Sequence, residues 1–164
     1  MTTERGTSSG GSRRGRHAAR LAAVQALYQM EITGDDNESV VRQFTEHRFA
    51  PNSGVDEEFF SDILRGVPKI QDEIDCAVRS ELSAEWTLKR IDSTLRAILR
   101  AGVFELLARR DVPAKVVIDE YVEIAKAFFP GDEPGFANAA LDKIAHRLRA
   151  REFGEVPADD AIDF

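Results

Sequence analysis

Basic side chains are concentrated in the first twenty residues of a chain that is otherwise acidic. This segment holds five arginines and a single acidic residue, Glu4, so it carries a net charge of +4. The whole chain carries −7, and residues 21–164 therefore carry −11 (−7 less +4). A cationic segment on an anionic protein attracts a polyanion to one place and repels it elsewhere. The candidate nucleic-acid ligands in this segment are Arg13, Arg14, Arg16, His17 and Arg20.

Charge alone leaves a second interpretation open. Basic termini rich in Ser and Gly also serve as flexible, solubilising tails, and residues 5–12 have the composition of a linker. Four basic side chains on single-stranded RNA would give a salt slope of about −3, which is shallow for a high-affinity complex. An RNA-binding role would therefore require help from a partner or from other residues.

The rest of the sequence offers little material for catalysis or for holding a metal. His17, His47 and His146 are far apart, and none has the spacing of a metal site with another histidine or with Cys76. No glycine-rich segment has the preceding strand and the following Lys-Ser/Thr that a phosphate-binding loop requires. We therefore expect no enzymatic activity, no metal and no cofactor. Cys76, the only cysteine, is expected to be a buried or half-buried small hydrophobic residue.

Helical periodicity recurs along the chain, whereas strand signals are nearly absent. Pro68 removes a backbone donor, so the third helix is expected to kink or break near Gly66. The pattern predicts an all-α fold of about six helices. Their approximate ranges are 17–33, 37–44, 56–78, 95–107, 113–129 and 135–152.

The two ends of the chain differ from the helical part in composition. Residues 1–12 are rich in Ser and Gly, and residues 153–164 contain four acids and no basic residue. We expect both tails to be disordered and residues 13–152 to form a single compact helical domain. No apolar run approaches the roughly 20 residues that span a bilayer, and the N-terminus lacks the apolar region of a signal peptide. The sequence therefore predicts a cytoplasmic protein.

Two kinds of side chain in the predicted helices leave alternatives open. Arg100 and Glu105 lie beside the apolar stripe of the central helix, where a hydrogen bond to a neighbouring helix is the favoured interpretation. Phe136 and Tyr28 are aromatic, and core packing is favoured for both. An exposed aromatic at either position would instead be able to stack on a nucleobase.

Several short sequence blocks follow one another in a fixed order between residues 13 and 148. They occupy residues 16–20, 23–29, 98–100, 104–106, 112–113, 115–120, 123–126 and 136–142. Each block alone is weak, but together and in this order they resemble the NusB family of transcription antitermination proteins. Only the two tails lie outside the resemblance.

The resemblance to this family implies both a fold and a function. The implied fold is all-helical and built as two three-helix halves. The implied function is binding of the boxA element of nascent RNA, notably in ribosomal RNA operons, together with the small-subunit ribosomal protein NusE. With other Nus factors the pair joins RNA polymerase and keeps it elongating past terminators. The resemblance leaves open whether the free protein is a monomer or a homodimer.

The resemblance also implies which residues face the RNA. The family's basic motif falls on residues 16–20, where a run of adjacent arginines is thinned, so Arg13 and Arg14 are expected to compensate. The RNA-facing aromatic falls on Phe136 and the acidic loop position on Asp132. A helical adaptor that contacts an acidic protein through its arginines, without binding RNA directly, stays open as the alternative function.

Overall fold

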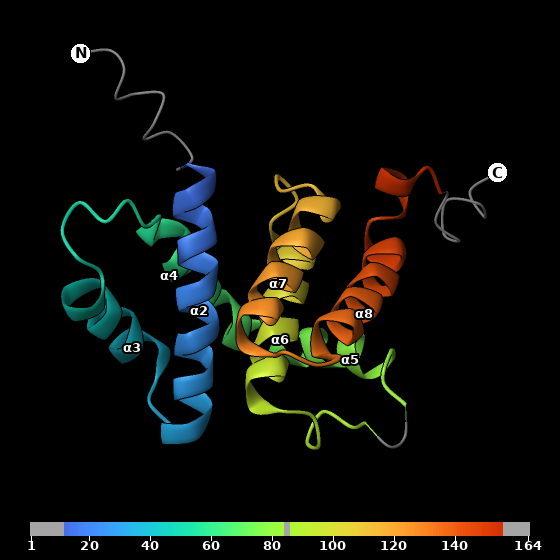
Figure 1. Cartoon of the computed structure of the whole chain (residues 1–164), viewed down its shortest axis with the longest axis horizontal. Coiled ribbons are helices and arrows are strands. Elements are labelled where there is room, and N and C mark those ends of the chain that lie inside the picture. Colours follow the sequence, from blue (N-terminus) through green and yellow to red (C-terminus); the bar gives the residue numbers. More distant parts are fainter. Residues whose placement is uncertain (1–11, 84–85, 156–164) are drawn as a thin grey trace, which may run out of the picture. The chain divides into compact units, whose positions relative to one another are not determined.

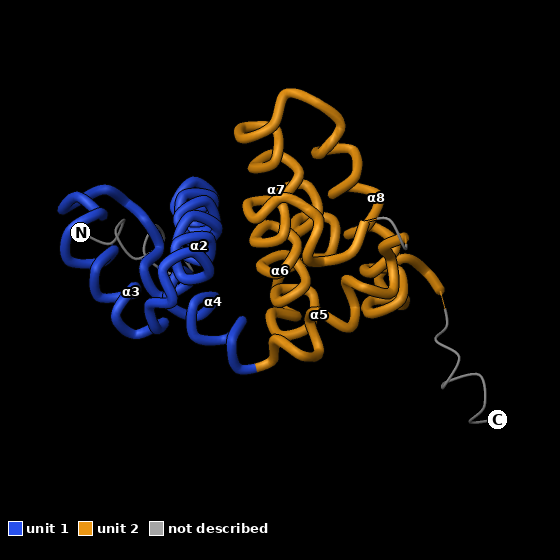
Figure 2. Tube along the Cα trace, turned by 90° about the horizontal axis from the view of Figure 1, so that it is seen from below, with its two compact units in different colours: residues 1–69 blue, residues 70–164 orange. Residues whose placement is uncertain are grey.

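The computed structural model describes residues 12–83 and 86–155, which divide into two compact units at Lys69 and Ile70 (Figure 1, Figure 2). Unit 1 contains the helices α2 (Arg13–Thr33), α3 (Asn37–Gln43), a π-helical turn η1 (Phe44–Arg48) and α4 (Glu57–Lys69). Unit 2 contains α5 (Gln71–Arg79), α6 (Ser93–Ala108), α7 (Ala114–Phe128), α8 (Glu133–Leu148) and a 3₁₀ turn η2 (Ala150–Phe153).

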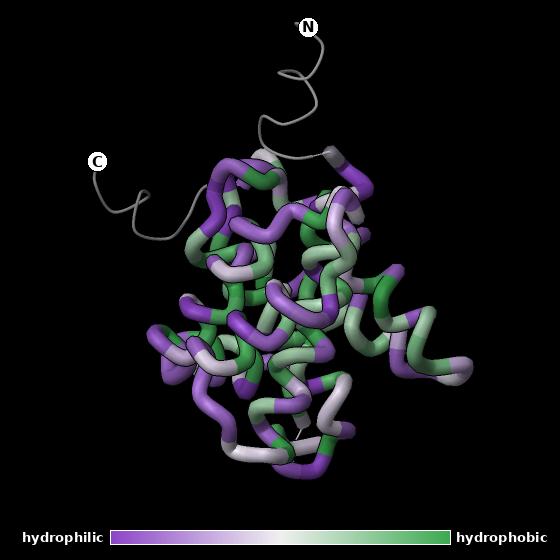
Figure 3. Tube along the Cα trace, turned by 90° about the vertical axis from the view of Figure 1, so that its left-hand side faces the viewer, coloured by the Kyte–Doolittle hydropathy of each residue, from purple (hydrophilic) through white to green (hydrophobic). Residues whose placement is uncertain are grey.

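The predicted all-α fold is confirmed, since the described residues form seven α-helices and no strand. Hydrophobic and hydrophilic residues alternate along these helices, as expected for elements that each bury one face (Figure 3). None of the helices in the described ranges is both long and apolar enough to traverse a bilayer. The tail residues 1–11 and 156–164, which we expected to be disordered, lie outside the described residues.

Three helix boundaries differ from the sequence-based ranges. α2 begins at Arg13, about one turn earlier than predicted, because the Ser12 side chain caps it by accepting a hydrogen bond from the Gly15 N–H at 2.8 Å. The expected break of the third helix occurs at Ile70, a few residues after Gly66, because Pro68 fits within the last turn of α4. The last α-helix ends at Leu148, and the chain continues as the 3₁₀ turn.

Unit 1 is built on the packing of α2 against α4, with α3 on α4. The buried Phe44 and Phe60 rings stack at 5.3 Å, and the half-buried Phe49 meets Phe60 edge-on at 5.0 Å. Small residues of α2, including Ala19 and Ala23, are fully buried. These alanines let the helix backbone of α2 approach its neighbours closely.

Unit 2 is organised around α6, which packs against α5, α7 and α8. Almost every residue of α6 from Leu95 to Leu106 is buried, with Arg100 the exception at intermediate exposure. At Gly102 an added Cβ would lie 3.1 Å from the Leu141 side chain, so a glycine permits close approach of α8. The helix therefore fills the centre of this unit, as its long apolar stripe predicted.

Two polar residues of α6 bond to neighbouring helices, which confirms the favoured interpretation of both. Arg100 forms a two-point ion pair with Asp75 of α5, with distances of 2.8 and 3.0 Å. Glu105 is fully buried and accepts a hydrogen bond from the Tyr121 hydroxyl of α7 at 2.6 Å. Without these partners, the polar groups of Arg100 and Glu105 would destabilise the apolar centre of unit 2.

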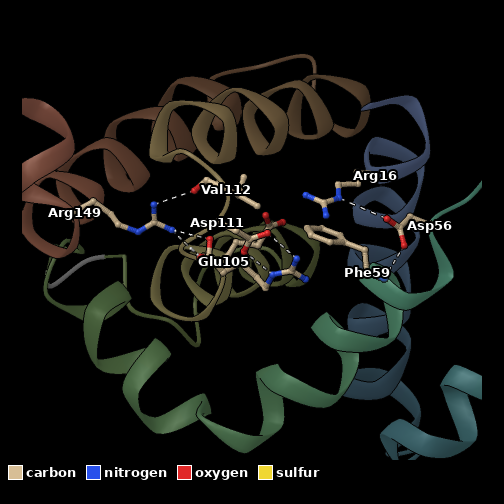
Figure 4. A network of polar contacts seen from close by, with 8 residues as sticks. Arg16, Asp56, Phe59, Glu105, Asp111, Val112 and Arg149 are labelled. Atoms are coloured by element: carbon tan, nitrogen blue, oxygen red, sulfur yellow. Dashed lines mark hydrogen bonds and ion pairs between the residues drawn. The ribbon is translucent and has the colours of Figure 1, made fainter. Parts of the chain in front are cut away.

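Arg149 holds the C-terminal end of α6 by donating to its carbonyl groups (Figure 4). Its guanidinium donates to the carbonyls of Leu106, Val112, Glu105 and Arg109 at 2.8 to 3.1 Å. The side chain also pairs with Glu152, which accepts from the Ala114 N–H. Burial alone would raise the pKa of Glu152, but the hydrogen bonds from Ala114 and Arg149 outweigh it and lower that pKa.

Two predictions about burial are wrong. Cys76 is exposed, because Ile74 and Val78 occupy the buried face of α5 and Cys76 lies between them on the other side. Tyr28 is 41% exposed, because its neighbour Leu27 takes the buried position on α2. Helical spacing identified an apolar stripe in each case, but it did not show which residues stand at the exposed edge of that stripe.

Candidate nucleic-acid interface

The first turn of α2 presents two arginines to solvent. Arg13 and Arg14 are the first residues of the helix and both are exposed. Neither makes a hydrogen bond or an ion pair with another residue in the described part of the chain. Arg13 lies on the same helix face as Arg16, His17 and Arg20, since these positions are three, four and seven residues apart. Arg14 points about 100° around the helix, which widens the basic surface.

Arg16 is held against the start of α4 (Figure 4). Its Nε lies 3.6 Å from Oδ2 of Asp56, an ion pair too long for a hydrogen bond. The guanidinium carbon lies 4.6 Å from the centre of the Phe59 ring, a cation–π contact. The buried Nε makes no hydrogen bond. Arg16 is therefore oriented by unit 1 without its hydrogen-bonding capacity being used up.

The sequence predicts that Arg20 is a nucleic-acid ligand, but the structure packs its side chain deeply within unit 1. It is only 3% exposed, and its guanidinium carbon lies 4.8 Å from the same Phe59 ring. His17 is half-buried. The structure therefore divides the five predicted basic residues into an exposed pair, Arg13 and Arg14, and a packed group that includes Arg16, His17 and Arg20.

A glycine and a loop hold the N-terminal end of α2 in place. The Gly15 carbonyl accepts a hydrogen bond from the Asp56 N–H at 3.1 Å. A Cβ at Gly15 would lie 2.4 Å from the carbonyl oxygen of Gly54, so only glycine fits here without movement of the loop. The loop before α4 is thereby fixed beside the arginines, with the Asp56 carboxylate accepting from the Phe59 N–H at 3.0 Å.

The charge pattern of α2 is opposite to that of most other helices. Acidic residues occupy the first turn of α3, α4, α5 and α8, and basic residues occupy their last turn. This arrangement complements the helix dipole, whose N-terminal end is positive. The first turn of α2 holds no acidic residue and begins with two arginines. The two arginines therefore have the same sign as the helix dipole at this end of α2, a combination that favours the binding of an anion.

The other two predicted ligands lie together at the start of α8 in unit 2. Asp132 is exposed and caps the helix through its carbonyl, which accepts from the Phe136 N–H at 3.0 Å, while its carboxylate makes no capping hydrogen bond. Phe136 is half-buried and its ring centre lies 6.5 Å from that of Trp86. The predicted ligands thus form two groups, one in each unit. Among the residues that the structure describes, no three His, Cys, Asp or Glu side chains form a metal-binding cluster.

Sequence relatives of this chain point to one family. A sequence profile of the NusB family matches residues 17–146. The "Transcription antitermination protein NusB" of Caulobacter vibrioides is 54% identical over 140 residues, covering 82% of this chain and 94% of the relative. The protein of the same name from Maricaulis maris is 54% identical over 144 residues, covering 84% and 90%.

Two solved structures with this fold carry the same name. A structure of T. maritima NusB matches with a TM-score of 0.73 and 30% identity, covering 85% of this chain and 96% of the other. A crystal structure of antitermination factors NusB and NusE in complex with dsRNA matches with a TM-score of 0.72, covering 82% and 98%. At 22% identity this second likeness shows the fold alone.

Proposed function

The chain belongs to the NusB family, and on that premise we propose that it is a transcription antitermination factor that binds boxA RNA together with the ribosomal protein NusE. Bound to nascent transcripts of ribosomal RNA operons, the pair acts with other Nus factors on the RNA polymerase elongation complex and promotes processive elongation. Support comes from relatives named for antitermination and from a solved NusB–NusE complex with RNA that shares the fold.

The observation that carries the RNA-binding part is the exposed pair Arg13 and Arg14 at the positive end of α2. Cations at a helix N-terminus are unfavourable for the fold, so intramolecular stability does not explain them. An anionic ligand does. In this proposal the arginines contact phosphates, which position the RNA without reading its sequence.

Phe136 and Asp132 provide the groups that would contact bases. A half-buried ring at a loop-to-helix junction offers a surface on which an unpaired base stacks. The exposed Asp132 carboxylate would accept a hydrogen bond from a base amino group, as Asp does from cytosine. No step of this function requires catalysis or a cofactor, and the protein acts in the cytoplasm, where transcription takes place in bacteria.

The experiment compares two double variants that lose the same charge in the same unit. Arg13→Gln/Arg14→Gln removes the exposed pair, and Arg42→Gln/Lys69→Gln removes two other exposed basic residues of unit 1. Binding of a labelled boxA RNA is measured by fluorescence anisotropy at several salt concentrations, with and without NusE. Loss of two phosphate contacts should lower the salt slope by about 1.4 and weaken binding on the order of 25-fold at 0.1 M salt.

The control pair should bind like the parent chain. Equal affinity of all three proteins would contradict the proposal. Affinity capture before and after ribonuclease treatment separates the adaptor alternative, because an adaptor would keep its partners after the RNA is destroyed. Substituting Arg16 and Arg20 is less informative, since both pack on Phe59 and their removal would also disturb unit 1.

A further inference from the structure

Trp86 is the only tryptophan of the chain, and 56% of it is exposed. It lies in the segment between α5 and α6, close to the first turn of α8, where its ring faces Phe136 at 6.5 Å with an interplanar angle of 39°. Large aromatic side chains usually contribute their area to a core. Packing within unit 2 therefore leaves most of the Trp86 surface unexplained.

The segment that carries Trp86 is anchored on the side that leads into α6. Leu88 and Ile91 are buried, and their carbonyls accept hydrogen bonds from the Arg96 guanidinium at 2.5 and 3.0 Å. The backbone N–H of Trp86 donates to the Ser83 carbonyl at 3.1 Å. These contacts hold the backbone that leads from Trp86 to α6 in place.

Two basic residues without a described partner, Lys89 and Arg90, closely follow Trp86 in the chain. Lys89 and Arg90 are exposed, and neither side chain bonds to another residue of the described ranges. Asp92, which follows Arg90 by two residues, caps α6 by accepting hydrogen bonds from the Thr94 and Leu95 N–H groups. Aromatic faces next to unpaired cations are the combination by which proteins bind single-stranded nucleic acids.

We propose that Trp86 and Phe136 form a base-stacking platform for single-stranded RNA and that Lys89 and Arg90 contact the adjoining phosphates. This proposal rests on the proposed function and extends it, since it assigns an RNA-contacting surface to residues of the segment before α6. Sequence reasoning passed over Trp86 because it stands in a connecting segment without helical periodicity. A protein partner on this surface is the competing outcome.

The single tryptophan allows a direct test on the full chain. Protein containing 5-fluorotryptophan has one ¹⁹F resonance, which is followed while a 12-nucleotide single-stranded boxA RNA or NusE is added. The RNA should shift the resonance. RNA affinity, measured by anisotropy, should fall about 5- to 100-fold in Trp86→Ala and be largely restored in Trp86→Phe, because a phenyl ring also stacks. Val116→Ala, another exposed apolar position of unit 2, is the control.

A charge-matched pair tests the phosphate contacts. Lys89→Ala/Arg90→Ala should lower the salt slope by about 1.4, whereas Lys115→Ala/Lys126→Ala, which removes two exposed lysines from α7, should leave it unchanged. Circular dichroism confirms that each variant is folded. This comparison does not depend on the tryptophan variants.

The outcomes separate the two proposals. RNA binding by the parent chain with an unmoved ¹⁹F resonance and full affinity in Trp86→Ala would overturn the platform and leave the proposed function intact. A resonance that responds to NusE and not to RNA would also overturn it. If the parent chain bound no RNA, with or without NusE, both the platform and the proposed function would be contradicted.

Discussion

Arginines at two helix ends of this protein have opposite surroundings. Arg149 is 2% exposed and donates hydrogen bonds to four carbonyls at and beyond the C-terminal end of α6. Arg13 and Arg14 stand exposed in the first turn of α2 without a bond to another described residue. The first arrangement stabilises unit 2, and the second does nothing comparable for unit 1.

The difference follows from the polarity of the helix. The last carbonyls of a helix have no intrahelical donor, and a cation there satisfies them and complements the dipole. At the first turn the free groups are N–H donors, which a cation only repels. Arg149 therefore stands where a cation stabilises the helix, whereas Arg13 and Arg14 stand where it does not and are available for a ligand.

Replacing Arg149 should give the largest effect on stability. Arg149→Met keeps much of the buried volume but leaves the carbonyls of α6 without donors and Glu152 without its cation, so unfolding free energy should fall by about 3–5 kcal/mol. Urea unfolding at pH 7 measures it. Lys143→Met, an exposed change on α8, should stay within about 0.5 kcal/mol. A loss below about 1 kcal/mol for Arg149→Met would mean that the hydrogen bonds of Arg149 do not stabilise unit 2 as argued above.

An intermediate effect is expected where the loop meets the basic end of α2. Gly15→Ala places a Cβ 2.4 Å from the Gly54 carbonyl oxygen, so the loop must move, at about 1–3 kcal/mol. Gly135→Ala is the matched control, because no atom of the described residues comes within 4 Å of a Cβ placed there and alanine should stabilise α8 by about 0.5–1 kcal/mol. Hydrogen exchange at the Asp56 amide should accelerate only in the first variant. Equal exchange in both would mean that the contact with Gly54 does not hold the loop.

The sequence predicted the elements of this fold better than the surroundings of individual side chains. Apolar spacing located the helices, and the expected bonding of Arg100 and Glu105 to neighbouring helices is confirmed. Spacing did not reveal that Arg20 packs on Phe59, because that contact joins residues far apart in the chain. The same limit hid the role of Arg149, whose partners belong to α6 and the following loop. The assignment of RNA ligands stays a prediction.

The smallest expected effect is an increase in stability on removal of the exposed arginines. Arg13→Gln/Arg14→Gln removes cations from the positive end of α2, so it should stabilise the fold by about 0.3–1 kcal/mol per residue at low salt, while RNA binding weakens. In Arg42→Gln/Lys69→Gln the cations come from the last turns of α3 and α4, where they are favourable, so stability should fall slightly. Thermal unfolding at 20 mM and 500 mM salt measures both changes, and screening should shrink both at the higher concentration. If the two pairs shifted stability in the same direction, the dipole would not account for the difference between the helix ends. Opposite shifts would mean that α2 retains its first two arginines at the expense of stability, as a binding surface would require.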